Sequence, residues 1–460
     1  MQIITAQYVR GCYFTDWAHY RPGIGSYNPE SYMPGLCTHI FFAFGNIQSD
    51  FTASAFDPAD LPTGPNGGYF ARVNALKQQQ PGLKTLLSFG GFSAGTWIFK
   101  QMASSSQNRQ IFIRSALSFI NQYGFDGIDI DWEYPDSSDK QNFATFMKEL
   151  KQAAGNKLVT IAVSAAASKV DAGYDVPALS QSVDFINVMT YDFHGTWESQ
   201  TGQNSPLFSA PGDTTNFNTA FSMNYWAQKG MSKSKLLLGI ATYGRGWRLT
   251  NPSNNGLGAP GNPSPPQPFT GTDGFAAYYE ICTLGGIRQW DDNQKVPFLV
   301  NGSLWYGYDD AQSVSGKMQW LKDNGFAGAF VWTLDFDDFS GRCGTRYPLL
   351  TAILNGLSNG PSVAPSSNRT IAPPQRPITT RPPTIPPFQS TPRKPITQNP
   401  NLPFSCPSQN GFFPDPTNCG MYYQCINGIP FKFSCPPGLL WNQSIQGCDW
   451  PDNTSCVHHK

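Results

Sequence analysis

The sequence predicts an α/β fold, a (β/α)8 TIM barrel, and three observations support this prediction. Short apolar runs alternate with helical patterns over roughly the first 350 residues, as expected for strands followed by helices. There are eight such runs, the number of strands that closes this barrel. The rival doubly wound sheet normally carries a G-x-G-x-x-G phosphate loop, and the sequence has none.

The eight predicted strands follow one another along the chain at barrel-like spacing. They are residues 9–13, 39–44, 84–90, 127–131, 159–165, 185–191, 236–241 and 328–332. Helical patterns fill several of the gaps, namely 107–123, 139–154 and 313–324. The gap before the last strand, roughly 245–327, is too long for one helix and carries the aromatic residues Trp247, Trp290, Tyr306 and Tyr308.

The composition excludes several classes of protein. Charged residues make up 13% of the chain, aromatic residues 14%, and the formal net charge is zero. This balance favours a sugar binder and gives no basic surface for nucleic acid and no general attraction to charged partners. No window approaches 18 consecutive apolar residues, so we expect no membrane span. The five histidines lack metal-ligand spacing, and we expect no metal and no cofactor.

Two segments follow the predicted barrel domain, which we assign to residues 1–358. Residues 359–403 hold thirteen prolines, scattered Ser and Thr, and no Asp or Glu, which is typical of a semi-rigid linker that carries O-linked sugars. Residues 404–460 hold six of the ten cysteines, a density that indicates a small disulfide-rich module.

The cysteines also indicate a secreted, extracellular protein. Four N-glycosylation triplets agree with this, at Asn301, Asn368, Asn442 and Asn453. A secreted chain is expected to carry a signal peptide, but the stretch before Tyr8 is too short for one and lacks an apolar core.

The most informative segment is 126–133, which reads Asp-Gly-Ile-Asp-Ile-Asp-Trp-Glu. Side chains alternate along a strand, so Asp129, Asp131 and Glu133 share one face and the apolar residues between them share the other. Three neighbouring carboxylates would repel one another unless they held a shared, shifted proton. A carboxylic acid that stays protonated near neutral pH is what glycosidic bond cleavage requires of its general acid.

Two other interpretations of this segment fit less well. A calcium loop starting at Asp129 needs Gly at its sixth position and a carboxylate at its twelfth, where this chain has Tyr134 and Lys140. A solvated acidic strand on an open sheet would not need the apolar residues on its other face, which indicate a helix-covered barrel strand.

The pattern Asp126-x-x-Asp129-x-Asp131-x-Glu133 resembles the signature of glycoside hydrolase family 18, the family of chitotriosidase-like chitinases. The resemblance extends from residue 9 to about 357. Further segments that carry it are Ser88–Gly91, Met189–Gly195, Thr242–Arg245 and Gly328–Trp332. It implies that 245–327 forms a small α+β insertion that walls a cleft, and that the substrates are chitin and chitooligosaccharides.

The resemblance also implies roles for individual residues. The family uses the 2-acetamido group of the substrate as nucleophile, with Glu133 as general acid. Asp131 is then expected to share a proton with Asp129 and to orient the acetamido N–H, while Tyr191 donates its hydroxyl to the acetamido carbonyl. Residues expected to bind substrate are Trp332, Asp192, Met189, Tyr243, Arg245, Trp17, Trp197 and Phe92. Phe92 is a departure, because related chitinases often have Trp there and Phe lacks the indole N–H. We expect Ser88 and Asp126 to be scaffold residues.

The C-terminal residues 404–460 resemble a peritrophin-type chitin-binding module in the order of their cysteines and in the segments around Trp441 and Trp450. We expect Trp450 to stack on sugar rings and Trp441 to lie in the core. Six cysteines alone allow fifteen pairings. The resemblance implies the pairs Cys406–Cys425, Cys419–Cys456 and Cys435–Cys448, and in the barrel we expect Cys12–Cys37 and Cys282–Cys343.

The sequence therefore predicts a secreted, monomeric chitinase that retains configuration and is tethered to its polymer by the C-terminal module. The main alternative is a chitin-binding lectin of the same fold that has lost catalysis. Such lectins usually lack the last acid of the motif, which is present here as Glu133. A third interpretation, cleavage of the chitobiose core of N-glycans, leaves the chitin-binding module without a purpose.

Overall fold

The computed structural model describes residues 8–62, 67–358, 404–408, 411–426, 429–435, 440–443, 447–449 and 454. The chain divides into two compact units, residues 1–364 and 365–460, and each is described by itself.

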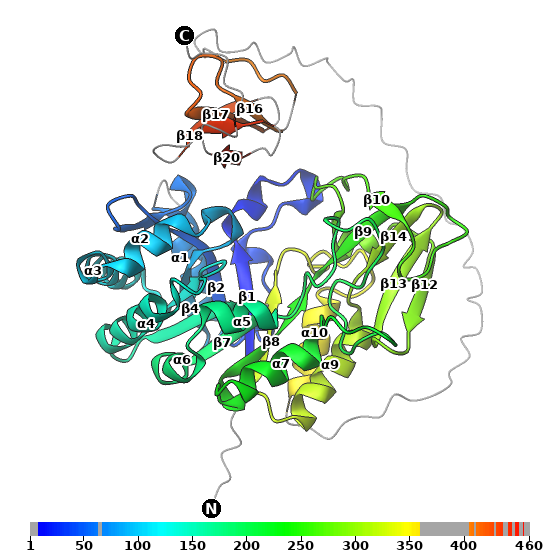
Figure 1. The fold of residues 1–460 in the computed structure, drawn as a ribbon, viewed down its shortest axis with the longest axis horizontal. Helices are drawn as coiled ribbons and strands as arrows, with labels where there is room; N and C mark the ends of the chain where they lie inside the picture. The colour runs from blue at the N-terminus through cyan, green and yellow to red at the C-terminus, as the bar shows by residue number, and fades with distance from the viewer. Residues whose placement is uncertain are drawn as a thin grey trace, which may run out of the picture. The chain divides into compact units, whose positions relative to one another are not determined.

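Within the described residues of the first unit, eight parallel strands close into a barrel (Figure 1). Their order is β1-β15-β8-β7-β6-β5-β4-β2, and pairing of β2 with β1 closes the ring. Their bounds are β1 (Val9–Thr15), β2 (His39–Ile47), β4 (Lys84–Gly90), β5 (Gly127–Asp131), β6 (Leu158–Ser164), β7 (Phe185–Met189), β8 (Leu236–Ala241) and β15 (Gly328–Trp332). The predicted TIM barrel is confirmed.

Two strands differ from the prediction. β2 continues to Ile47 because its last residues pair with the short strand β3 (Ala53–Ala55). β7 ends at Met189, two residues early, so Tyr191 lies in the loop above the barrel. The chain turns there because Asp192 adopts a left-handed conformation, with φ 56°.

Helices form the outer layer around these strands (Figure 1). The α-helices of this layer are α1 (Gly68–Gln79), α2 (Trp97–Ser104), α3 (Ser106–Tyr123), α4 (Lys140–Ala154), α5 (Ala167–Gly173), α6 (Val176–Ser182), α7 (Thr219–Gln228), α9 (Ala311–Asp323) and α10 (Pro348–Leu357). Short 3-10 helices in the connecting loops are η1 (Asp16–Tyr20), η2 (Gly23–Gly25), η3 (Pro29–Ser31), η4 (Pro58–Asp60), η5 (Phe92–Ala94) and η6 (Lys233–Lys235). Ile128, Ile130 and Trp132 pack into the apolar layer between strands and helices, which turns the acids of β5 towards the barrel interior.

An insertion between β8 and β15 forms a second, antiparallel sheet beside the barrel (Figure 1). Its elements are β9 (Tyr243–Leu249), β10 (Gly261–Pro263), β11 (Phe275–Ala277), α8 (Tyr278–Ile281), β12 (Ile287–Asp291), β13 (Val296–Asn301) and β14 (Leu304–Gly307). This sheet ends before α9, which packs against α10 in the barrel wall. Trp247, Tyr306 and Tyr308 are buried in the insertion, and Trp290 is half-buried.

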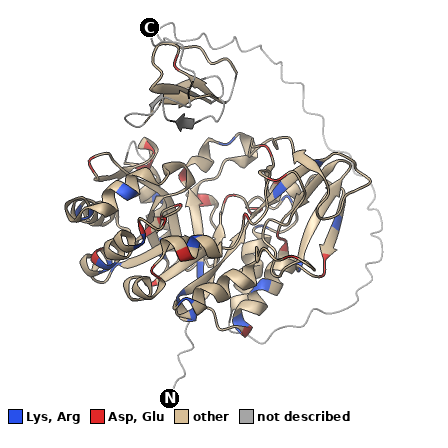
Figure 2. Ribbon diagram, in the orientation of Figure 1, with Lys and Arg blue, Asp and Glu red and all other residues tan. Residues whose placement is uncertain are grey.

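Disulfide bonds join Cys12 to Cys37 and Cys282 to Cys343 in this unit. Acidic and basic residues are interspersed over it (Figure 2), in keeping with the zero net charge of the chain. Within the part of the chain that the structure describes, no helix has the length and apolar character needed to cross a bilayer.

The second unit contains a three-stranded sheet of β16 (Gly411–Pro414), β17 (Met421–Ile426) and β18 (Ile429–Ser434), and a pair, β19 (Leu440–Asn442) and β20 (Gly447–Asp449). A disulfide joins Cys406 to Cys425. Cys419 and Cys435 are also disulfide-bonded, but Cys456 and the side chain of Cys448 lie outside the described residues. Trp441 is buried against Tyr422, as expected of a core residue, and Trp450 lies outside the described residues.

Candidate active site

The acids of the motif lie at the carboxyl end of β5, where TIM barrels hold their catalytic groups. Asp129 and Asp131 are the third and fifth residues of the strand, and they are 0% and 3% exposed. Glu133 follows two residues after the strand and is half-buried. The three carboxyl groups therefore rise from the barrel interior to the floor of the loops above it.

Asp129 is bonded by hydroxyl groups from three other strands. Its Oδ2 accepts hydrogen bonds from the Tyr13 hydroxyl of β1 (2.8 Å) and the Ser88 hydroxyl of β4 (2.7 Å). Its Oδ1 accepts one from the Thr160 hydroxyl of β6 (2.6 Å). Burial raises the pKa of Asp129, and the three hydroxyls oppose that rise. They favour the ionised form of this carboxyl group.

Tyr13 and Thr160 were not among the residues singled out in the sequence. Both lie in strands that otherwise read as apolar runs. Thr160 stands directly opposite Asp129 in the register of β5 and β6, which only the folded sheet reveals. Ser88 faces Asp129 from the other neighbouring strand, so its part is to support Asp129.

Asp131 has a different environment from Asp129. Burial and the charges of Glu133 and Asp129 raise the pKa of Asp131 well above its usual value, and no hydrogen bond opposes the rise. Asp129 acts on Asp131 through its charge, and a proton shared between the two stays a prediction. The raised pKa favours the protonated form of Asp131.

The pKa of Glu133 lies near neutral pH. Burial raises the pKa of Glu133 to about 7; a hydrogen bond with Tyr134 opposes the rise, and the charge of Asp192 adds to it. A group with this pKa is protonated in a useful fraction of molecules and still gives up its proton readily, as a general acid must.

The opposite wall of the site consists of Tyr191, Asp192, Tyr243 and Arg245. Arg245 Nε donates a hydrogen bond to Asp192 Oδ1 at 2.7 Å, and the Tyr243 hydroxyl is also bonded to Asp192. Burial raises the pKa of both tyrosines well above the usual value, so their hydroxyls stay protonated and can donate. Met189 is buried among the apolar residues beneath them.

Aromatic rings continue the site outwards. Trp332, at the end of β15, lies 5.3 Å from Tyr13 and stacks on Phe44 at 5.9 Å, measured between ring centroids. Trp17 also stacks on Phe44, at 5.8 Å, and lies 6.4 Å from Trp332. Phe44 was not predicted as a site residue, because it is part of an apolar strand. Gly91 has to be glycine here, since a Cβ atom at this residue would lie 2.5 Å from the Phe44 ring.

Other expected residues lie further from the acids. Trp197 is 61% exposed, with the Arg245 guanidinium 5.4 Å from its ring centre. Phe92 is 83% exposed in the loop after β4. Asp126 lies at the amino end of β5 in an ion pair with Lys77 (2.6 Å), away from the other acids, and is a scaffold residue.

Comparison with known proteins agrees with this geometry. Residues 9–337 match the family described as Glycosyl hydrolases family 18. The chain belongs to this family. Residues 406–456 match the Chitin binding Peritrophin-A domain.

Among relatives, a probable endochitinase of Caenorhabditis elegans is 42% identical over 98% of this chain and 78% of its own length. A crystal structure of a chitinase from Trichuris suis superposes with a TM-score of 0.74 at 45% identity, covering 76% of this chain and all of that one. Human YKL-39, described as a pseudo-chitinase that retains chitooligosaccharide binding, superposes with a TM-score of 0.72 at 36% identity, covering 76% of this chain and 99% of that one.

Proposed function

We propose that this family 18 glycoside hydrolase is a secreted chitinase that cleaves β-1,4 linkages between N-acetylglucosamine units of chitin. The observation that carries the proposal is the row of acids at the carboxyl end of β5, with Asp129 and Asp131 buried and Glu133 half-buried above them. Burial raises the pKa of Glu133 to about 7, so it can protonate a leaving oxygen, and the pKa of Asp131 beside it is also raised. A retaining glycosidase needs such an acid at its cleft.

The proposed reaction uses the acetamido group of the substrate as nucleophile. Its carbonyl oxygen attacks the anomeric carbon while the bond from that carbon to the bridging oxygen breaks, and Glu133 gives its proton to that oxygen. Tyr191 donates its hydroxyl to the acetamido carbonyl, and a carboxyl oxygen of Asp131 accepts the acetamido N–H, which together fix the attacking geometry. Water then opens the oxazolinium ring and returns a proton to Glu133, so configuration is retained overall.

The remaining wall residues bind the sugar in this proposal. Trp332 forms the floor beneath the sugar whose linkage is cleaved, because aromatic faces stack on pyranose C–H groups. Asp192, with its partners Tyr243 and Arg245, supplies polar contacts, and Met189 fills the space below. Trp17, Trp197 and Phe92 extend the contact along the chain of sugars.

We also propose that residues 404–460 hold the enzyme on insoluble chitin through Trp450, with 359–403 as linker and 1–358 as the catalytic domain. Tethering raises the local concentration of the barrel at its polymer. The protein acts as a monomer outside the cell. The alternative of an inactive lectin, as YKL-39 is described, is not favoured, because Glu133 is present and its pKa suits a general acid.

The test is release of chitobiose from colloidal chitin by the intact chain and by Glu133→Gln. Loss of a general acid typically costs about 10²–10⁴ in rate, so we expect at least a 100-fold fall with chitin binding unchanged. Glu149→Gln, the same substitution on the outer helix α4, is the matched control and should keep full activity. Binding of chitin without release of sugar by the unaltered chain would instead make the protein a lectin.

A further inference from the structure

A second pair of buried acids lies outside the catalytic motif. Asp16 is the first residue of η1 and Asp60 the last residue of η4, and they are 1% and 0% exposed. Their carboxyl groups lie within hydrogen-bonding reach of each other. Asp60 Oδ2 also accepts the Asp57 N–H at 3.4 Å, while Asp16 Oδ2 and Asp60 Oδ1 meet no other donor among the described residues. Two carboxyl groups bond in this way only when a proton lies between them, so the pair shares one.

The surroundings of the pair keep this proton in place. Burial raises the pKa of Asp16 to about 7, and burial together with the charge of Asp16 raises that of Asp60 further. Asp57, which directly precedes η4, adds another negative charge and is bonded to the Tyr20 hydroxyl. His19 Nδ1 lies 2.5 Å from the carbonyl oxygen of Asp16 and its ring stacks on Tyr69 of α1. Among the described residues, no Lys or Arg charge lowers the pKa of either acid appreciably, so no cation replaces the proton.

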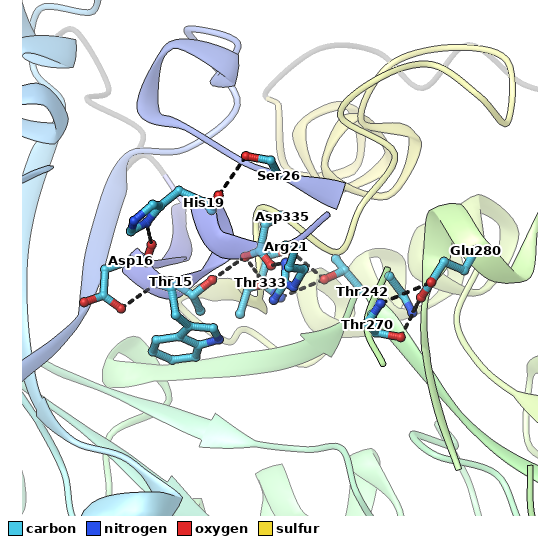
Figure 3. Close-up of polar contacts among 12 residues, drawn as sticks. Thr15, Asp16, His19, Arg21, Ser26, Thr242, Thr270, Glu280, Thr333 and Asp335 are labelled. Atoms are coloured by element: carbon cyan, nitrogen blue, oxygen red, sulfur yellow. Dashed lines mark hydrogen bonds and ion pairs between the residues drawn. The ribbon is translucent and has the colours of Figure 1, made fainter. Parts of the chain in front are cut away.

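The pair is bonded directly to the backbone of an aromatic residue of the cleft. The Trp17 N–H donates to Asp16 Oδ1 at 2.6 Å. On the other side of the same turn, Arg21 forms an ion pair with buried Asp335, which also accepts the Thr15 hydroxyl at 2.8 Å (Figure 3). The turn that carries Trp17 is therefore fixed from two sides, by the shared proton and by this ion pair.

We propose that Asp16 and Asp60 are a positioning pair that holds the Trp17 ring in the cleft and thereby sets the affinity for long chitooligosaccharides. The proposal rests on the function proposed above and goes beyond it. The two acids touch neither the substrate nor the reacting atoms. They act through Trp17, whose ring lies one aromatic residue beyond Trp332.

The consequence is selective. A short substrate that contacts only Trp332 and the acids does not need Trp17, whereas a chain of six sugars reaches further along the aromatic residues. Disturbing the pair should therefore raise KM for long substrates and leave kcat on short ones nearly unchanged. A purely structural role would instead lower the apparent kcat on long and short substrates alike, through the fraction of folded enzyme, and would not raise KM.

The test compares Asp16→Ala with Asp16→Asn in the full chain, using chitohexaose and an aryl glycoside of chitobiose. Alanine removes the acceptor of the Trp17 N–H and the proton partner of Asp60. Asparagine keeps an acceptor oxygen and supplies a permanent N–H to Asp60, so it is the matched control. We expect Asp16→Ala and Trp17→Ala each to raise KM for the hexamer about tenfold, with kcat on the short substrate within twofold for Asp16→Ala, and Asp16→Asn to restore the hexamer KM.

A double-mutant cycle tests whether the effect passes through Trp17. Asp16→Ala should cost nothing further in a Trp17→Ala background, because the two changes share one mechanism. Raising the pH well above neutral removes the shared proton, so the hexamer KM of the unaltered enzyme should rise while that of Asp16→Asn stays flat. Additive losses in the cycle, or equal pH dependence of the two proteins, would refute the proposal.

Two further measurements make every outcome decisive. If Asp16→Ala does not fold, Asp60→Ala disturbs the pair from its other member, and failure of both to fold would make the pair a folding element and refute its positioning role. If the unaltered chain releases no sugar, calorimetric affinity for chitohexaose replaces KM. A tenfold weaker affinity of Asp16→Ala would then support the pair even though the proposed catalytic function had failed.

Discussion

The position of the alkaline limb in the pH–activity profile depends on two neighbours of Glu133. Because Glu133 must be protonated to act and burial raises its pKa to about 7, kcat/KM should fall about tenfold per pH unit above that value. The charge of Asp192 contributes to the raised pKa, and Arg245, bonded to Asp192 at 2.7 Å, offsets that charge. Asp192→Asn should therefore move the limb to lower pH and Arg245→Gln should move it to higher pH.

The magnitudes follow from the ion pair. A close, uncompensated charge shifts a pKa by about 1–3 units. Arg245 cancels most of this, and the Asp192 side chain is 36% exposed, so solvent screens part of the rest. We expect Asp192→Asn to lower the midpoint of the alkaline limb by about half a pH unit, or ~0.7 kcal/mol at 1.36 kcal/mol per unit. Arg245→Gln leaves Asp192 unpaired and should raise the limb by about one unit.

The assay is kcat/KM on a soluble chitooligosaccharide over a series of pH values, with the midpoint of the limb as readout. The height of the profile is not the test, because both residues also line the site. Trp197→Ala removes the ring beside Arg245 without changing any charge and should leave the midpoint in place. Shifts of both charge variants in the same direction, or a stationary midpoint, would refute the electrostatic account of Glu133.

Three further predictions concern other parts of the chain. Tyr13→Phe removes one of the three hydroxyls on Asp129, a bond worth about 1.5–3 kcal/mol to a charged group, and should lower kcat at least tenfold on chitooligosaccharides and lower the melting temperature by a few degrees. Asp60→Asn should stabilise the fold increasingly as pH rises above ~4, by at most about 1.4 kcal/mol per pH unit. The reason is that the pKa of Asp60 is higher in the folded than in the unfolded protein, so folding takes up a proton. The stability that Asp60 contributes is full at low pH and is lost as the pH rises towards the folded pKa. Urea unfolding at acidic and neutral pH checks the sign. Deleting residues 404–460 should lower the rate on insoluble chitin several-fold and leave hydrolysis of soluble oligosaccharides within twofold, as measured by product release from each substrate.

The sequence predicted the barrel well because each of its strands is buried on both faces. Helices cover the outer face, and side chains of the other strands fill the barrel interior. Such strands appear as short apolar runs, and the eight runs lie within a few residues of the eight strands of the structure. The exception at β7 has a local cause. The run 185–191 continues as an apolar pattern past Met189, but the left-handed turn at Asp192 ends the strand early, and no apolar pattern encodes that turn.

The candidate site was predicted only where its residues are close in sequence. The acids of β5 follow one another at intervals of two, so alternation alone places them on one face. Tyr13 and Thr160 reach Asp129 from strands 116 and 31 residues away, and an isolated hydroxyl in an apolar strand carries no sign of its partner. Phe44 was missed for the same reason, since its contact with Trp17 and Trp332 depends on barrel closure.

The neighbours that the sequence does not reveal are also what give the three acids different roles. Asp129, Asp131 and Glu133 are like groups spaced two residues apart, so their spacing alone cannot say which of them acts as acid. Three hydroxyls favour ionised Asp129, its charge and burial keep the proton on Asp131, and the half-buried position of Glu133 brings its pKa to about 7. Different environments separate the proton affinities of like groups, and that separation assigns the acid. Sheet register brings Ser88 of β4 and Thr160 of β6 to Asp129, whereas the neighbours that act on Glu133, Tyr134 and Asp192, come from the loops at the carboxyl end of the barrel.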